Sequence, residues 1–225
     1  MRTLQLTDIM SKHATPARLE AFSDGVIAVI ITIMVLELKV PLQDGIAGLH
    51  AVLPTIGLYA LSFAFTGVYW VNHHHLVHRT DQADERTLYA NLFFLFWLSL
   101  LPFFTSYVVD KKMDSFSVML YVVSMILTAG SFGLLRIVIG RHLRETGRIE
   151  RADKAAERKH ALSLAMYLIA VACAFRYPSI SLAIVGLVTV VWIIPSAKVN
   201  PIAHCIDEHA AKHDSLGDAG SGGLR

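Results

Sequence analysis

Histidines at the end of an apolar stretch are the first candidates for chemistry in this sequence. His74 and His78 are four residues apart, so a helix would place them on one face at the spacing of a two-histidine metal site. A third strong ligand is lacking nearby in the sequence, and no His-Glu-x-x-His motif is present. Interfacial histidines more often hydrogen-bond to neighbouring helices, so we predict that this pair supports helix packing and holds no metal.

An acidic residue also lies within an apolar segment, where a charge is energetically unfavourable. Asp24 lies in the apolar segment 22–38, and placing its charge part-way into lipid would cost some kcal/mol. We therefore expect it to face protein or water. At 100° per residue, a helix would place four residues together on the face adjacent to that of Asp24: Gly25, Val29, Thr32 and Leu36. That face fits close helix packing or the wall of a narrow pathway, and the residues alone favour packing.

The sequence offers little support for enzymatic chemistry. Its serines have no consistent histidine and aspartate partners, and no glycine-rich phosphate loop is present. The two cysteines, Cys173 and Cys205, lack the spacing of a metal site or a disulfide framework. A net charge of +2 does not argue for nucleic acid. We therefore expect no catalytic residues, no cofactor and no nucleic-acid partner.

The elements that must position these side chains are predicted to be membrane-spanning helices. With 54% hydrophobic residues and a mean hydropathy of +0.52, the chain carries more apolar surface than one soluble core of this length buries. Six apolar stretches stand out, at about 22–38, 46–71, 88–108, 116–139, 161–175 and 180–195. The last two are separated by a charge and a proline at 176–179, which predicts a tight helical hairpin. The predicted fold is all-α, with six transmembrane helices.

The third stretch is predicted to be a kinked helix. It contains Pro102 and four polar residues, namely Asn91, Ser99, Thr105 and Ser106. The serine and threonine hydroxyls are expected to bond backbone carbonyls, and a ligand site is the alternative for this stretch.

Positive charge sets the expected orientation. Most lysines and arginines fall on one side of the six spans, which predicts cytoplasmic N- and C-termini. The segment 140–160 reads as a cytoplasmic helical extension whose arginines share one face and either remain solvated or contact anionic lipids, namely Arg141, Arg144, Arg148 and Arg151. We expect a cytoplasmic segment at 1–17, a membrane domain at 18–200 and a disordered cytoplasmic tail at 201–225.

A specific motif opens the first helix. Arg18, Phe22, Ser23 and Asp24 form R-x-x-x-F-S-D, which resembles the signature of the transmembrane protein 175 family of potassium channels. The likeness extends through the tryptophan and histidines that end the second stretch, the 91–105 pattern of the third, and the closing residues 192–195.

The resemblance implies a prokaryotic, single-repeat homotetramer in the cell membrane, with a central potassium pathway lined by the first helix. It reassigns the glycine- and threonine-containing face to that pathway: Val29, Ile33 and Leu36 would form a hydrophobic constriction, and Thr32 would contribute to selectivity. The signature residues would support the helix, with Asp24 and Glu37 raising the local cation concentration. The alternative is a secondary transporter or metal-ion carrier that uses the cluster 73–78 and Asp24.

Overall fold

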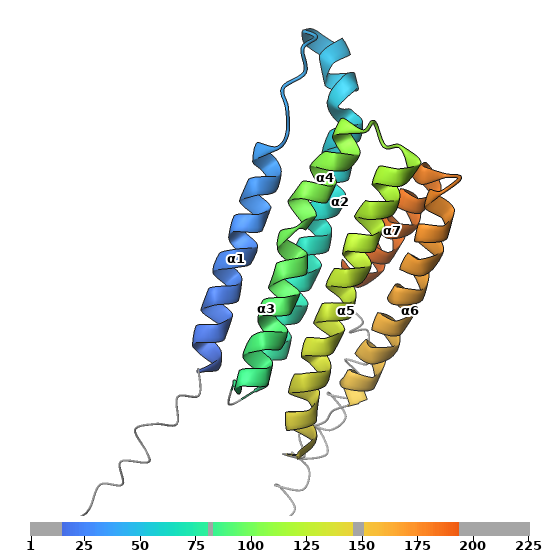
Figure 1. The fold of residues 1–225 in the computed structure, drawn as a ribbon. Coiled ribbons are helices and arrows are strands. Elements are labelled where there is room, and N and C mark those ends of the chain that lie inside the picture. The colour runs from blue at the N-terminus through green and yellow to red at the C-terminus, as the bar shows by residue number, and fades with distance from the viewer. Residues whose placement is uncertain (1–14, 81–82, 146–150, 194–225) are drawn as a thin grey trace, which may run out of the picture. The chain divides into compact units, whose positions relative to one another are not determined.

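The computed structural model describes residues 15–80, 83–145 and 151–193, and all the elements in these ranges are helices apart from short turns. The contacts discussed below lie in the first of two units, Met1–Val191. The helices, shown in Figure 1, are α1 Pro16–Leu36, α2 Gly45–Val77, α3 Glu85–Ser99, α4 Leu101–Asp110, α5 Ser115–Glu145, α6 Arg151–Ala174 and α7 Pro178–Ile193. The all-α prediction is confirmed for these residues.

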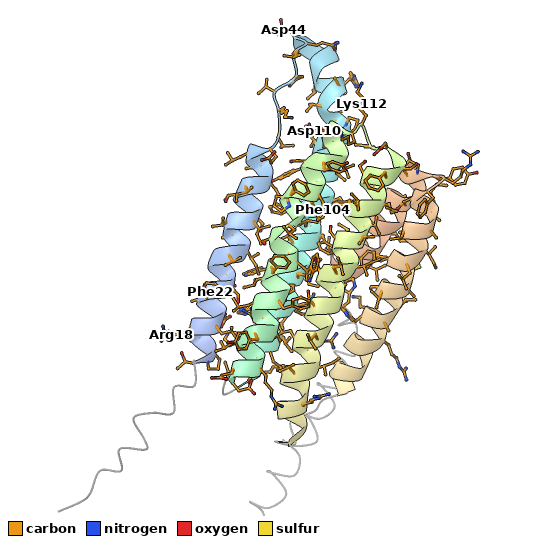
Figure 2. The ribbon with its side chains drawn as sticks, in the orientation of Figure 1. Arg18, Phe22, Asp44, Phe104, Asp110 and Lys112 are labelled. Atoms are coloured by element: carbon orange, nitrogen blue, oxygen red, sulfur yellow. The ribbon has the colours of Figure 1, made fainter. Side chains whose placement is uncertain are left out.

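α1 and α2 are antiparallel apolar helices. α1 has a proline in its first turn, where the missing N–H is harmless, and after Asp24 it is apolar as far as Leu36 except for Thr32. α2 contains 33 residues, so at 1.5 Å per residue it is about 50 Å long and exceeds the hydrocarbon core of a bilayer. Its first turns, next to Asp44, extend beyond the ends of the neighbouring helices (Figures 1 and 2).

The third apolar stretch is broken where the sequence predicts a kink. α3 ends at Ser99 and α4 begins at Leu101, with Pro102 in the first turn of α4. Ser99 and Thr105 donate hydrogen bonds to carbonyls of their own helices, as expected. Asn91 and Ser106 behave differently, because their side chains reach across to α1 and to Glu37 just beyond it.

α5, α6 and α7 complete the described chain. The carboxylate of Asp114 accepts a hydrogen bond from the backbone N–H of Ser117 at the start of α5, and the Ser117 hydrogen bonds hold the pKa of Asp114 below its usual value. α6 and α7 are separated by the short turn at 175–177, which confirms the predicted hairpin.

Some sequence predictions fall outside the described residues. Arg148 lies in the omitted segment 146–150, and the side chains of Arg144 and Arg151 are also outside the description, whereas Arg141 is exposed on α5. The predicted N-terminal segment lies almost entirely in the omitted residues 1–14, and the tail at 201–225 lies within the omitted residues 194–225.

Some of the helices are long and apolar enough to span a membrane. Among the described residues, four segments are long and apolar enough to cross a bilayer: α1, α2, the α3–α4 pair and α5. α7 is apolar but contains only 16 residues. Successive segments from α1 to α5 alternate in direction (Figure 1), with α3 and α4 counted as one segment.

Buried side chains from several helices fix α2 in place. Tyr69 of α2 packs against Phe94 of α3 and Phe132 of α5, at ring-centroid distances of 5.8 and 5.2 Å. Nearer the other end of α2, the hydroxyl of Ser62 lies 2.9 Å from those of both Thr105 in α4 and Tyr121 in α5. These contacts hold α2 and the α3–α4 segment as a frame against which α1 packs.

Candidate functional site

A directed chain of hydrogen bonds anchors one face of α1. His73 Nε2 lies 2.8 Å from Asn91 Oδ1, Asn91 Nδ2 donates to Ser23 Oγ at 2.9 Å, and Ser23 Oγ donates to the carbonyl of Leu19 at 2.8 Å. The final carbonyl can only accept, which fixes the direction of the chain: the Ser23 hydroxyl accepts from the Asn91 amide, and the Asn91 oxygen accepts from His73 Nε2–H. Three helices are joined through side chains that are fully buried.

Two further side-chain contacts, one helical turn apart, join α1 to α2. Trp70 Nε1 donates to Asp24 Oδ1 at 2.9 Å, and one turn away His74 Nδ1 lies 2.6 Å from Glu20 Oε1. The spacing of four residues on each antiparallel helix brings both pairs into register. Asp24 is therefore hydrogen-bonded to a neighbouring helix, as expected for an acid that would be costly to place in lipid.

The opposite face of α1 is apolar and has no such anchors. The exposed fractions of Val29, Ile33 and Leu36 are 54%, 43% and 81%. A Cβ atom added to Gly25 would meet no heavy atom within 4 Å, so the glycine serves no close contact inside the protomer. Helix packing, which the residues alone favoured for this face, does not occur there within the protomer.

Thr32 is the polar residue on this exposed face. Its hydroxyl donates to the carbonyl of Val29 at 2.9 Å. Because the proton is committed to the backbone, the lone pairs of the hydroxyl oxygen remain directed away from the helix and are available to an acceptor-seeking group such as a cation.

A groove of about 700 Å³ borders this face on one side. α1 contributes Phe22, Gly25, Val29 and Ile33 among its walls, and the α3–α4 segment contributes Ser99, Pro102, Phe103 and Ser106. Thr32 and Leu36 do not line the groove, so they occupy the more open side of the helix.

The chain just beyond α1 is anchored by exposed polar contacts. Ser106 Oγ donates to Glu37 Oε2 at 3.0 Å, and Lys39 Nζ lies 2.8 Å from Asp110 Oδ1. The hydrogen bond with Asp110 raises the pKa of Lys39 above its usual value, and the charge of Asp110 acts in the same direction.

The R-x-x-x-F-S-D residues divide between the two faces. Ser23 and Asp24 join α1 to its neighbours, whereas Phe22 is half exposed on the groove. Arg18 is exposed at the start of α1 (Figure 2) and makes no hydrogen bond or ion pair with any other side chain that the structure describes.

Sequence reasoning missed the partners that complete these anchors. Asn91 was identified only as a polar position in an apolar helix, and Glu20 was not selected although it lies four residues before Asp24. Glu20 also corrects one expectation directly: it is a third ligand-type side chain beside His74 and His78, supplied from 54 residues away in sequence.

Comparison with known proteins identifies the family. Residues 18–102, which span α1 to the kink at Pro102, match the family described as "Endosomal/lysosomal potassium channel TMEM175". A protein from Chryseobacterium sp. (strain P1-3) named as a potassium channel is 39% identical over 185 residues, covering 82% of this chain and 96% of its own. The chain belongs to the TMEM175 family. This membership confirms the family resemblance inferred from the R-x-x-x-F-S-D motif. It also confirms that the protein is not an enzyme, because the family consists of channels.

Other relatives agree in sequence and in structure. A protein from Streptomyces collinus named as a potassium channel is 32% identical, covering 76% of this chain and 87% of its own. The crystal structure of a lysosomal potassium-selective channel TMEM175 homolog from Chamaesiphon minutus superposes with a TM-score of 0.66 at 25% identity, over 79% of this chain and 96% of the other. The helical arrangement is therefore that of a TMEM175-type channel.

Proposed function

We propose that this protein is a potassium-selective leak channel in which α1 of each subunit lines a central pore. The observation that carries the proposal is the division of α1: its polar anchors all face helices of the same protomer, while Val29, Ile33 and Leu36 are left exposed. A surface of this kind is suited to a hydrophobic constriction formed when copies of α1 meet on a symmetry axis. The names of the relatives supply the ion, K⁺.

The proposed pore is passive and its selectivity involves Thr32. A ring of Thr32 hydroxyls, each with its proton bonded to the Val29 carbonyl, would present oxygen lone pairs to a partly dehydrated cation. The apolar residues around it would narrow the pathway and gate it by dewetting.

The assembly we propose is a homotetramer with six membrane spans in each subunit and both termini in the cytoplasm of a prokaryotic cell. Four copies of α1 around one axis would cover the exposed face, including Gly25, where the protomer leaves space for close approach. α6 and α7 would provide the last two spans. The exposed arginine of α5, Arg141, would lie near anionic headgroups on the cytoplasmic side.

Flux through liposomes tests the proposal. Purified protein should carry K⁺ faster than Na⁺ down a concentration gradient, with no proton gradient or counter-ion required. A verified tetramer that passes no cation would refute it. A flux that requires a coupled gradient and disappears in the His74→Ala/His78→Ala double variant would instead support the transporter or metal-ion carrier.

Substitutions on the open face test the location of the pore. Val29→Asn and Leu36→Asn should each raise conductance because an amide wets an apolar constriction. Val35→Asn, which is also exposed but lies on the neighbouring face of the same helix, is the matched control and should change conductance less. Unchanged currents in both test variants would place the pore elsewhere.

Thr32 can be tested separately. Thr32→Ala should change the permeability order among K⁺, Cs⁺ and Na⁺, whereas Thr32→Ser keeps the hydroxyl and should preserve that order. An unchanged order in Thr32→Ala would remove Thr32 from the selectivity site.

A further inference from the structure

Three ligand-type side chains converge where the start of α1 meets the end of α2. Glu20 Oε1 lies 2.6 Å from His74 Nδ1 and 3.6 Å from His78 Nε2. The rings of His74 and His78 are perpendicular, with centroids 4.5 Å apart, and the ligand atoms of all three residues lie within 4.8 Å of one another. Two imidazoles and one carboxylate thus surround a common point.

We propose that Glu20, His74 and His78 form a binding site for a divalent transition-metal ion of the Zn²⁺ type, which bridges α1 and α2. Imidazole nitrogen and carboxylate oxygen are ligands that Zn²⁺ takes at about 2.0–2.2 Å, and a set of two histidines and one glutamate leaves a fourth position for water. The same donors also suit Co²⁺, Ni²⁺ and Cu²⁺ and are a poor match for Mg²⁺ or Ca²⁺.

The geometry requires only a small adjustment. Tetrahedral ligands at zinc distances are separated from one another by about 3.3 Å. The Glu20–His78 separation of 3.6 Å is already close to that value, and the Glu20–His74 hydrogen bond at 2.6 Å must open so that the ion takes the place of the shared proton. The ligand atoms of His74 and His78, which lie within 4.8 Å of each other, must likewise reach that separation.

The surrounding structure holds the ligands in place. His74 and His78 are separated by one helical turn, and the backbone N–H of His78 donates to the carbonyl of His74 at 3.0 Å. The Trp70 ring stacks beside His74 at 6.2 Å while its indole N–H is held by Asp24. The Glu20 side chain is only 17% exposed. Such contacts around a metal site orient the ligands and limit the cost of assembling them.

A hydrogen bond to Glu20 does not account for the position of His78. Glu20 needs only His74 to form its hydrogen bond, and His78 is 63% exposed and stands 3.6 Å from the same oxygen, beyond hydrogen-bonding distance. A metal ion gives this third side chain a role. His78 is therefore the residue that separates the two explanations.

Zinc titration of the purified full-length protein in detergent tests the site. His78→Ala should weaken the tightest Zn²⁺ binding by about tenfold or more, since even the loss of a supporting contact around a metal ligand costs 10- to 100-fold in affinity. His78→Cys, which replaces one zinc ligand with another, should restore it. His75→Ala is the matched control, because His75 lies in the same turn and is exposed but is not part of the cluster.

Zinc bound by other histidines remains in every variant and cancels in the comparison. Equal affinities for the wild-type protein and His78→Ala would overturn the proposal. So would a wild-type Co²⁺ complex without the visible absorption of tetrahedral coordination.

Folding and function are controlled separately. Without metal, His78→Ala should unfold at the same temperature as the wild-type protein, and zinc should raise the unfolding temperature of the wild-type protein more than that of the variant. Equal zinc-dependent shifts in the two proteins would overturn the proposal. These measurements involve no ion flux, so a failed metal site and a failed channel are distinguishable.

Discussion

The two faces of α1 are both rich in apolar residues, yet only one of them has partners in the protomer. Ile27, Ile30 and Met34 are buried against neighbouring helices, on the same side as the Ser23 hydrogen bonds. Val29 and Leu36 are at most a few residues away in sequence and are exposed. Apolar character alone therefore does not distinguish a packed face from an open one in a membrane helix, because lipid tails satisfy either.

What distinguishes the faces is the placement of polar side chains. Glu20, Ser23 and Asp24 point to helices that can hydrogen-bond them, and Thr32 on the open face bonds only its own backbone. The polar contacts therefore stabilise the protomer through one face, and the other face remains available for the proposed pore. Substitutions on the two faces should therefore affect different measurements.

The largest loss of stability is expected from Asn91→Leu. The substitution keeps a similar volume but removes both links made by Asn91, so His73 Nε2 loses its partner and Ser23 Oγ keeps only its bond to the Leu19 carbonyl. His73 Nδ1 already lacks a partner among the described residues. The unpaired His73 Nε2–H and the lost hydrogen bond to Ser23 should together reduce the free energy of unfolding by about 2–4 kcal/mol. Chemical denaturation in detergent measures the change.

Asn72→Ala is the control for that experiment. Asn72 donates only to the carbonyl of Val68 in its own helix, so its removal leaves no cross-helix partner unsatisfied. If Asn91→Leu were no less stable than Asn72→Ala, the buried chain would not be what anchors α1.

A pair of truncations compares the packed and open faces directly. Ile27→Ala truncates a side chain that is 1% exposed and should reduce the free energy of unfolding by about 1–3 kcal/mol. This lies toward the lower end of the range for buried residues, because in lipid only packing contacts are lost. Val29→Ala, two residues further along the same helix, should cost much less in the protomer. Thermal unfolding of both variants, dissociated to protomers, provides the measurement; equal losses would mean that the open face is also packed.

A smaller effect is expected at the side-chain contact between Trp70 of α2 and Asp24 of α1. Trp70→Phe keeps an aromatic ring but removes the donor to Asp24, which should cost about 0.5–1.5 kcal/mol, as for other hydrogen bonds between membrane helices. Trp97→Phe is matched to it, because Trp97 Nε1 is buried without a partner in the described part of the chain. The free energy of unfolding should fall in the first variant only. A greater loss in Trp97→Phe would contradict this assignment.

Local sequence signals predicted much of this architecture. The kink before Pro102 and the turn before Pro178 follow from the chemistry of proline, and the helical angle of Asp24 predicted that a neighbouring helix would satisfy it. Fold class followed from apolar composition.

Contacts distant in sequence could not be predicted in this way. Consecutive histidines point in different directions on a helix. The position of α3 decides that His73 is buried against Asn91, and the position of α1 decides that His74 contacts Glu20. The residues on the open face were identified by spacing, but nothing local indicates whether another helix of the protomer covers them. That requires the tertiary structure.

The smallest effect is expected at the exposed ion pair beyond the end of α1. Lys39→Gln should alter stability less than any substitution above, since an exposed lysine–aspartate pair is well solvated even when it is separated. Its signature is a dependence on pH. The pKa of Lys39 is raised above its usual 10.5 in the folded protein, so the contribution of the pair is fully present at neutral pH and is lost as pH rises through the higher folded value.

The stability difference between the wild-type protein and Lys39→Gln should therefore be constant from neutral pH to about pH 10 and should vanish at more alkaline pH. Asp110→Asn should show the same alkaline behaviour, because it removes the other half of the pair. A difference that persisted unchanged above the folded pKa would show that Lys39 acts through packing of its aliphatic chain. The Leu36 end of α1 would then be anchored in the same way as its packed face, and the contrast between buried and exposed anchors would apply only to the end that carries Ser23.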